Sequence, residues 1–168
     1  PHNIALGPRR IASYLRCKGI DAAVVDYCIH KKEEYLDFIQ HNQPPIIAFS
    51  ILYDTLEHDL QNIWQARQLC PNSIIVIGGI EATNNSEEYI EKLPIDVLVL
   101  GEGEIPTLTM IKRIGSKQIS KEEVLKSFSD IPGLKIRLAG GNIARTGPAR
   151  LLTAEESQEV FSAYELYL

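Results

Sequence analysis

The fold of this chain is decided by two stretches, SIIVIGGIEAT at residues 73–83 and DVLVLGEGE at residues 96–104. Each is an apolar, β-branched run that ends abruptly in glycine, as is typical of a parallel strand buried on both faces. Ligands of open α/β sheets bind at the carboxyl edge, where such strands end. The glycine-rich loops therefore predict a surface that holds a large ligand by backbone contact. Because these loops lack lysine and serine, they indicate neither a Walker-type phosphate loop nor a catalytic triad, and we expect no catalytic residue.

Apolar runs alternate with helical patterns along most of the chain. Strands are expected near residues 22–27, 46–51, 73–77 and 96–100, with helices between them. Such alternation predicts βαβ units with right-handed crossovers, and so an α/β domain with a doubly wound, flavodoxin-like (Rossmann-like) parallel sheet. The glycine pair at 140–141 predicts a β-hairpin over residues 134–146, because its turn needs positive φ.

The beginning and end of the chain suggest a fragment. A flavodoxin-like sheet has the strand order 2-1-3-4-5, with the first strand in the centre. Here a loop leads straight into the first helix, so if residues 22–27 form the second strand, the first strand lies upstream of Pro1. Residues 154–168 read as a helix without a cap at its end.

Composition excludes several classes of protein. The chain has 168 residues, enough for one domain with a core, and a formal net charge of −5. We expect no nucleic-acid partner, because no stretch dense in lysine and arginine could neutralise phosphates. The doublets Arg9-Arg10 and Lys31-Lys32 are expected to be solvated helix ends. No apolar run approaches the roughly 18 residues needed to span a membrane, so no membrane partner is expected either.

The cysteines indicate a reducing compartment. Cys17, Cys28 and Cys70 lie far apart and form no metal-ligand spacing, so we expect no metal site. Their odd number, without a signal peptide, predicts reduced thiols and a cytoplasmic protein.

Motifs in a fixed order make the chain resemble the cobalamin-binding domain of B12-dependent radical S-adenosylmethionine enzymes. Each motif is weak alone, but their order is specific, and together they cover nearly the whole chain. They are LGPRRIASYLR at 6–16, IDAAVVDY at 20–27, AFS at 48–50, GGIEAT at 78–83, GEGE at 101–104 and IPGLKIR at 131–137.

The resemblance implies a cofactor site at the carboxyl edge. A corrin is broad and flat, with amide arms that pair with backbone groups, and glycines let the main chain approach it closely. Gly79→Val is expected to block that approach and leave the fold nearly intact. The implied contact residues are Leu6, Gly7, Ser50, Leu52, Tyr53, Gly78, Gly79, Glu81, Ala82, Gly101, Glu102 and Gly103.

Three of these residues have a simpler interpretation as well. Ser50 is placed to bond the nucleotide base of the cofactor, or else it bonds its own backbone. Glu81 and Glu102 could accept hydrogen bonds from amides or a ribose, or serve as helix N-terminal acids favoured by the dipole.

The lower face of the cobalt is expected to lack a histidine. Many cobalamin modules carry Asp-x-His-x-x-Gly, whose histidine binds the metal. With Gly7 as the final glycine, His2 takes the aspartate position and Ile4 the histidine position. The resemblance therefore implies a base-off cofactor without a histidine ligand, unless a shift in register makes His2 the ligand.

The resemblance also implies that this chain is one domain of a larger protein, whose other parts bind the remaining cofactors. The chain has no Cys-x-x-x-Cys-x-x-Cys run, so the [4Fe–4S] cluster and S-adenosylmethionine would bind in a radical barrel of the same chain. Residues 1–115 would form the cobalamin domain, 116–152 a connector and hairpin, and 153–168 the start of a linker helix. The alternatives are a flavodoxin-like ligand-binding or docking module without cobalamin, or a receiver-like signalling domain, for which Asp54 is the one candidate acceptor.

Overall fold

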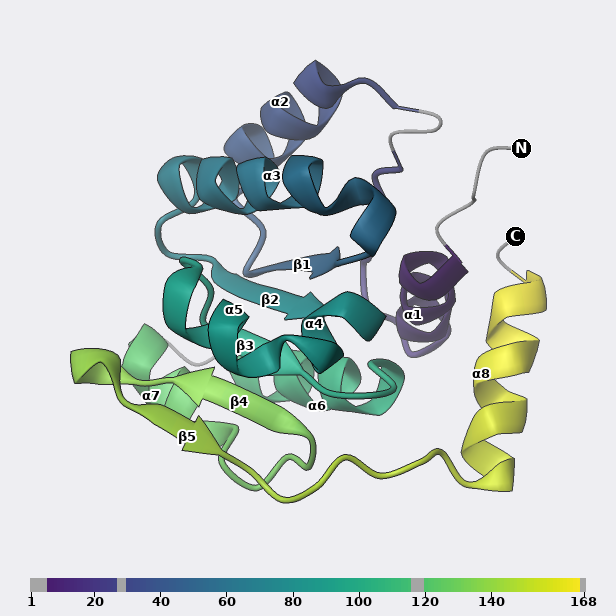
Figure 1. Cartoon of the computed structure of the whole chain (residues 1–168). Coiled ribbons are helices and arrows are strands. Elements are labelled where there is room, and N and C mark those ends of the chain that lie inside the picture. The colour runs from purple at the N-terminus through teal and green to yellow at the C-terminus, as the bar shows by residue number, and fades with distance from the viewer. Residues whose placement is uncertain (1–5, 27–29, 116–119, 167–168) are drawn as a thin grey trace.

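A five-stranded sheet runs through the middle of the molecule, with helices on both of its faces (Figure 1). The computed structural model describes residues 6–26, 30–115 and 120–166. The strands lie side by side in chain order, and they are β1 (Ile46–Ser50), β2 (Ile74–Gly78), β3 (Val97–Val99), β4 (Leu134–Arg137) and β5 (Ile143–Arg145). Strands β1 to β3 are parallel, whereas β4 and β5 are antiparallel to their neighbours. The sheet is therefore mixed, and the predicted hairpin β4–β5 continues it.

The helices agree with the periodic segments of the sequence. They are α1 (Leu6–Cys17), α2 (Lys32–Asn42), α3 (Leu56–Leu69), α4 (Ile80–Asn84), α5 (Ser86–Lys92), α6 (Glu104–Ile114), α7 (Lys121–Ser127) and α8 (Ala154–Leu166), with short 3-10 turns at Tyr53–Thr55 and Ala139–Gly141. Helix α7 lies within the segment expected to be a polar connector. The helix begins at a capping box, in which the Ser120 hydroxyl accepts a hydrogen bond from the Glu123 N–H while the Glu123 carboxylate accepts one from the Ser120 N–H. None of the helices in the described ranges is long and apolar enough to cross a membrane.

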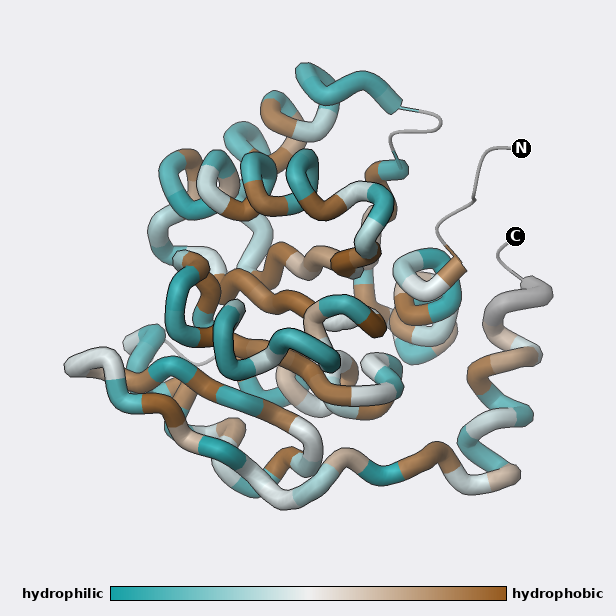
Figure 2. The backbone as a smooth tube through the Cα atoms, viewed as in Figure 1, coloured by the Kyte–Doolittle hydropathy of each residue, from teal (hydrophilic) through white to brown (hydrophobic). Residues whose placement is uncertain are grey.

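Both faces of the interior strand β2 are buried, which explains its unbroken apolar run. Ile75 and Ile77 belong to the core under α2, α3 and α5. Ile74 and Val76 belong to the core under α6 and α7. The strands accordingly form the apolar centre in Figure 2, with polar residues on the outer faces of the helices. Burial of each such side chain contributes about 1.5–3 kcal/mol.

The strand predicted at residues 22–27 is not formed. Residues 20–26 have no regular secondary structure, and Tyr27 lies outside the described residues. A strand needs a neighbour to pair with, and within the described ranges β1 stands at the edge of the sheet with β2 as its one partner. The segment is held instead by side chains, since Val25 packs on the core and the Arg16 Nε–H donates to the Ala22 carbonyl at 2.7 Å.

Asp96 fixes the amino edge of the sheet, opposite the glycine loops. Its carboxylate accepts from the Ile75 N–H at 2.8 Å and lies 2.5 Å from Arg67 Nη2. Lys121 of α7 is 2.9 Å from the same oxygen, Oδ2. One buried carboxylate therefore ties together a strand, helix α3 and helix α7.

Helix α8 packs alongside α1 at one end of the molecule (Figure 1). An extended segment, residues 146–153, runs from β5 to α8, and Leu152 in it contacts the apolar cluster of α1, α6 and α8. Lys18 pairs with Glu159 of α8, and Tyr14 packs beside them. The end of α1 near Lys18 is thus secured by α8.

Candidate functional site

The carboxyl ends of β1, β2 and β3 lie together at one edge of the sheet. Ser50 is paired with Gly78 in the parallel register, and Ile77 with Leu98. The loops after β1, β2 and β3 are consequently neighbours, as the two glycine-rich stretches predicted.

Gly79 occupies a position that admits only glycine. Its φ is +97°, and a Cβ there would lie 2.8 Å from the Ile51 carbonyl oxygen and 3.2 Å from Ser50 Oγ. The backbone of the two loops is in contact here, since the Ile51 N–H donates to the Gly78 carbonyl at 2.8 Å. At Gly78, by contrast, a Cβ would make an ordinary contact of 3.7 Å with the Val99 carbonyl. The expectation that Gly79→Val leaves the fold nearly intact is therefore wrong, because the residue is needed for the loop itself.

Ser50 lies between two glycines that are far apart in the sequence. A Cβ on Gly7, in the first turn of α1, would be 3.9 Å from Ser50 Oγ, and one on Gly79 would be 3.2 Å from it. The structure thus brings together three of the predicted site residues from three different segments. The hydroxyl of Ser50 therefore lies beside the backbone of Gly7 and of Gly79.

Large apolar side chains stand exposed around these glycines. Their exposed fractions are 60% for Leu6, 41% for Leu52, 80% for Tyr53 and 69% for Ile80. Each is a chain neighbour, within two residues, of Gly7, Ile51 or Gly79. Large apolar side chains that gather on the surface of a folded protein are typical of a site of interaction. Ile80 was missed by the sequence argument, although an apolar residue at the first position of a helix, directly after two glycines, was a visible signal.

The loop after β3 is held by charges from α1. Gly101 has a φ of +73°. Arg10 Nε lies 2.6 Å from Glu104 Oε1 and forms an ion pair with it. Glu102 lies 3.8 Å from Arg10, and its other carboxylate oxygen accepts from the Leu152 N–H at 3.2 Å. Glu102 is therefore engaged inside the chain, next to the predicted site residue Gly103.

The expectation that Arg9-Arg10 is a solvated doublet is wrong. Arg9 lies 3.4 Å from the buried carboxylate of Asp26, and Arg10 pairs with Glu104. Both guanidinium groups thus connect α1 to other segments of the chain.

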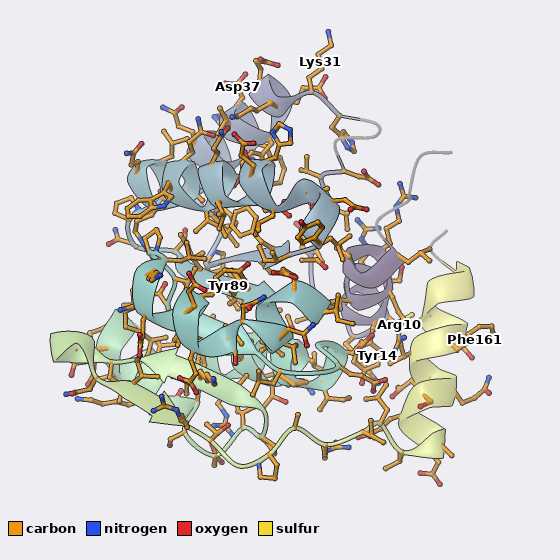
Figure 3. All side chains as sticks on the ribbon, in the orientation of Figure 1. Arg10, Tyr14, Lys31, Asp37, Tyr89 and Phe161 are labelled. Carbon is orange, nitrogen blue, oxygen red and sulfur yellow. The ribbon has the colours of Figure 1, made fainter. Side chains whose placement is uncertain are left out.

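Glu81 is also engaged within the chain. Its Oε1 accepts from Asn85 Nδ2 at 2.7 Å and from the Tyr89 hydroxyl at 3.0 Å. Burial, together with this bond, raises the pKa of Tyr89 to about 12. Glu81 thereby joins α4 to α5, on which Figure 3 labels Tyr89. Ala82, another predicted contact residue, is fully buried in the core below.

A cavity of about 230 Å³ lies next to the Gly101–Gly103 loop. It is smaller than the roughly 300–1,000 Å³ of pockets that enclose drug-sized ligands. A ligand as large as a corrin would therefore not fit inside this cavity. The lining residues are Leu100, Glu102, Ile105, Pro106, Thr109, Arg113, Asp130, Ile131, Pro132, Ala149, Arg150 and Leu152.

The described ranges hold no group of three or more His, Cys, Asp or Glu side chains that could bind a metal ion. The positions discussed for the lower cobalt ligand, His2 and Ile4, lie outside the described residues.

Comparison with known sequences relates most of the chain to one family of domains. A protein-family model described as "B12 binding domain" matches residues 3–109. The anaerobic magnesium-protoporphyrin IX monomethyl ester cyclase of Cereibacter sphaeroides is 32% identical over 107 residues. That match covers 63% of this chain and 17% of the cyclase, so the chain spans less than a fifth of the curated relative.

Solved structures share the fold. The cobalamin-dependent S-adenosylmethionine radical enzyme OxsB, with aqua-cobalamin and S-adenosylmethionine bound, superposes with a TM-score of 0.68 at 18% identity, over 98% of this chain and 23% of OxsB. The radical S-adenosylmethionine methyltransferase TsrM from Kitasatospora setae gives a TM-score of 0.70 at 18% identity, over 89% of this chain and 28% of TsrM. At this level of identity the likeness is one of fold.

Proposed function

Because the chain belongs to the B12 binding domain family, we propose that it is the cobalamin-binding domain of a B12-dependent radical S-adenosylmethionine enzyme. The observation that carries the proposal is the meeting of Gly7, Ser50 and Gly79 at the carboxyl edge, surrounded by exposed apolar side chains. Backbone without side chains allows close approach by the cofactor. The apolar rim complements the wide, flat face of a corrin.

The chemical types of the residues at this edge suit the parts of cobalamin that they would contact. Ser50 offers one hydroxyl beside Gly7 and Gly79, where a Cβ on either glycine would lie 3.9 Å or 3.2 Å from it, and we assign this hydroxyl to the nucleotide tail. Leu6, Leu52, Tyr53 and Ile80 would pack against the ring and exclude water. Bound cobalamin would supply methyl transfer or related radical chemistry, while the protein supplies binding and orientation. The residues that would hold it are Leu6, Gly7, Ser50, Leu52, Tyr53, Gly78, Gly79, Ile80, Gly101 and Gly103.

We further propose that the cofactor is bound base-off and without a histidine. Ile4 stands where many cobalamin modules place the histidine ligand. The apolar side chains of Leu52 and Tyr53 would then face the lower side of the corrin and keep water away from it.

The remaining functions are assigned to other parts of the same protein. S-adenosylmethionine and the [4Fe–4S] cluster would bind in a radical barrel reached through α8, with residues 1–115, 116–152 and 153–168 as the cobalamin domain, the hairpin region and the linker. The edge position of β1 supports a flavodoxin-like order in which a strand from upstream of Pro1 pairs with β1. Cys17 and Cys70 are free thiols, in keeping with a cytoplasmic location.

A flavodoxin-like docking module without cobalamin is the second candidate. It is favoured by Glu81 and Glu102, whose carboxylates are already bonded to Tyr89 and to the Leu152 backbone. Titration of the purified protein with hydroxocobalamin, followed by its visible absorption, separates the two. We expect saturable 1:1 binding that Ser50→Leu weakens. If the folded protein does not perturb the spectrum at any concentration, the cobalamin proposal is wrong.

A further inference from the structure

We propose that Arg10 is a positioning residue of the cobalamin site, which holds the first turn of α1 against Ser50 by pairing with Glu104. This inference rests on the proposed function. Arg10 is not among the residues proposed to contact the cofactor, and its role would be to hold one of them in place. The guanidinium lies between α1 and the start of α6, and Figure 3 labels Arg10 on α1.

The Glu104 carboxylate of this ion pair is buried and lies close to Arg10. The side chain of Glu104 is 5% exposed, and its Oε1 lies 2.6 Å from Arg10 Nε. The second oxygen, Oε2, is buried and has no hydrogen-bond partner. A buried carboxylate needs compensation of its charge, and among the residues that the structure describes Arg10 is the cation within 4 Å of it. Glu102, 3.8 Å from Arg10, adds a second negative charge to the same cluster.

The position of Arg10 along α1 connects this ion pair to the cofactor edge. Arg10 is three residues after Gly7, so the two are about one helical turn apart. A Cβ on Gly7 would lie 3.9 Å from Ser50 Oγ, so this turn of α1 lies beside Ser50. On the same helix Ile11 lies against Gly103, where a Cβ would be 2.8 Å from the Ile11 Cδ1 atom. Two loops of the proposed site therefore touch one short stretch of α1.

The opposite end of α1 is secured independently. Lys18 pairs with Glu159 of α8, and Tyr14 and Leu15 are buried against Val160 and Ala163. Loss of the Arg10–Glu104 pair should therefore release the first turn of α1 in preference to the whole helix. The expected consequence is a displaced Gly7 and a weaker cofactor site on a protein that stays folded.

The test compares Arg10→Gln with Lys18→Gln. Each removes one positive charge from the α1 region, but only the first lies beside the proposed site. In titrations with hydroxocobalamin we expect Arg10→Gln to bind about tenfold more weakly than the unaltered protein, equivalent to about 1.4 kcal/mol. Lys18→Gln should bind with unchanged affinity. The double variant Arg10→Gln/Glu104→Gln should bind no more weakly than Arg10→Gln, because the two groups act as one unit.

A measurement without cofactor gives an independent readout. Amide hydrogen exchange in residues 10–12 should accelerate in Arg10→Gln and stay slow in Lys18→Gln, while β2 exchanges equally slowly in both. Arg10→Lys keeps the charge on an unbranched chain and should recover part of the lost affinity. This variant also serves if Arg10→Gln does not fold.

The outcomes separate this inference from the proposed function. If the unaltered protein does not bind hydroxocobalamin, the proposed function and the inference fail together. If it binds and Arg10→Gln binds as tightly, the inference alone is wrong. It is equally wrong if Lys18→Gln weakens binding as much as Arg10→Gln, or if Arg10→Lys recovers nothing.

Discussion

Gly79 lies so close to Ile51 that a Cβ at position 79 would be 2.8 Å from the carbonyl oxygen of Ile51. No real Cβ contact is that short, and both partners are backbone, which cannot rotate away. The positive φ of Gly79 adds a second reason against any side chain. The loop between β2 and α4 can therefore adopt this conformation only with glycine at position 79.

Gly79→Ala should cost about 2–4 kcal/mol of unfolding free energy, because it combines backbone strain with a steric clash. Cobalamin binding should be lost at the same time. The matched control is Gly78→Ala, whose Cβ meets the Val99 carbonyl at an ordinary 3.7 Å. Denaturant unfolding should find this control within about 1 kcal/mol of the unaltered protein. Equal stability of the two variants would contradict the geometry described for the loop.

Tyr53→Ser should weaken cobalamin binding about tenfold without loss of stability. Tyr53 is largely exposed, so it contributes little to folding, yet it stands at the proposed corrin face. Trp64→Ser, at another exposed aromatic residue on α3, is the control and should leave binding unchanged. Titration and thermal unfolding of both variants provide the measurement. A drop in stability for Tyr53→Ser that matches the drop in affinity would argue against direct contact.

Asp96→Ala should reduce the free energy of unfolding by about 3 kcal/mol, since it leaves Arg67 and Lys121 without their shared carboxylate. Cofactor affinity should not change, because Asp96 lies at the amino edge of the sheet. Glu88→Ala, which breaks the exposed pair with Lys92, should cost less than about 1 kcal/mol. Chemical unfolding of the two variants checks the difference. A similar cost for both would show that the Asp96 network contributes no more than a surface ion pair.

Stability should decline in acid partly through Glu87. Hydrogen bonds from Arg145 and, to a smaller extent, from Lys135 lower the pKa of Glu87 from 4.5 to about 2 in the folded protein. Because the folded pKa lies below the unfolded one, the contribution is complete above pH 4.5 and disappears as the pH falls towards 2. In Glu87→Gln the decline between these values should be shallower. A Glu87→Gln profile identical to that of the unaltered protein would refute the assignment.

Electron paramagnetic resonance of the Co(II) form at low temperature should show no nitrogen superhyperfine splitting. This follows from Ile4 at the position of the histidine ligand in other modules. A triplet splitting from one coordinated nitrogen would mean that His2, another histidine or the tail base binds the metal. The proposal of a base-off cofactor without a histidine ligand would then be wrong.

The arrangement of the strand ends at the candidate site could be predicted because its signals are local. An apolar run that ends in two glycines marks a buried strand and a bare loop, whatever lies around it. Parallel strands bring their carboxyl ends to one edge, so Ser50 and Gly78 could be expected side by side before any packing was known. Ile80 followed the same pattern and could have been included.

Other features depend on partners that no local pattern identifies. Residues 22–26 have the composition of a strand, but a strand exists only where a neighbour supplies the other half of its hydrogen bonds. The antiparallel pairing of β4 with β3 was likewise invisible, since the hairpin pattern does not say which sheet it joins.

The sequence by itself determined the α/β class, the position of the strand ends and the places where glycine exposes the backbone, because these follow from residue type and spacing within a few residues. The tertiary structure alone decided that Gly7 approaches Ser50 and that Arg10 pairs with Glu104, 94 positions further along. Such contacts arise from how α1 packs against α6 and the sheet. That packing is a balance of many weak contacts spread over the whole chain, so no single stretch of sequence encodes it.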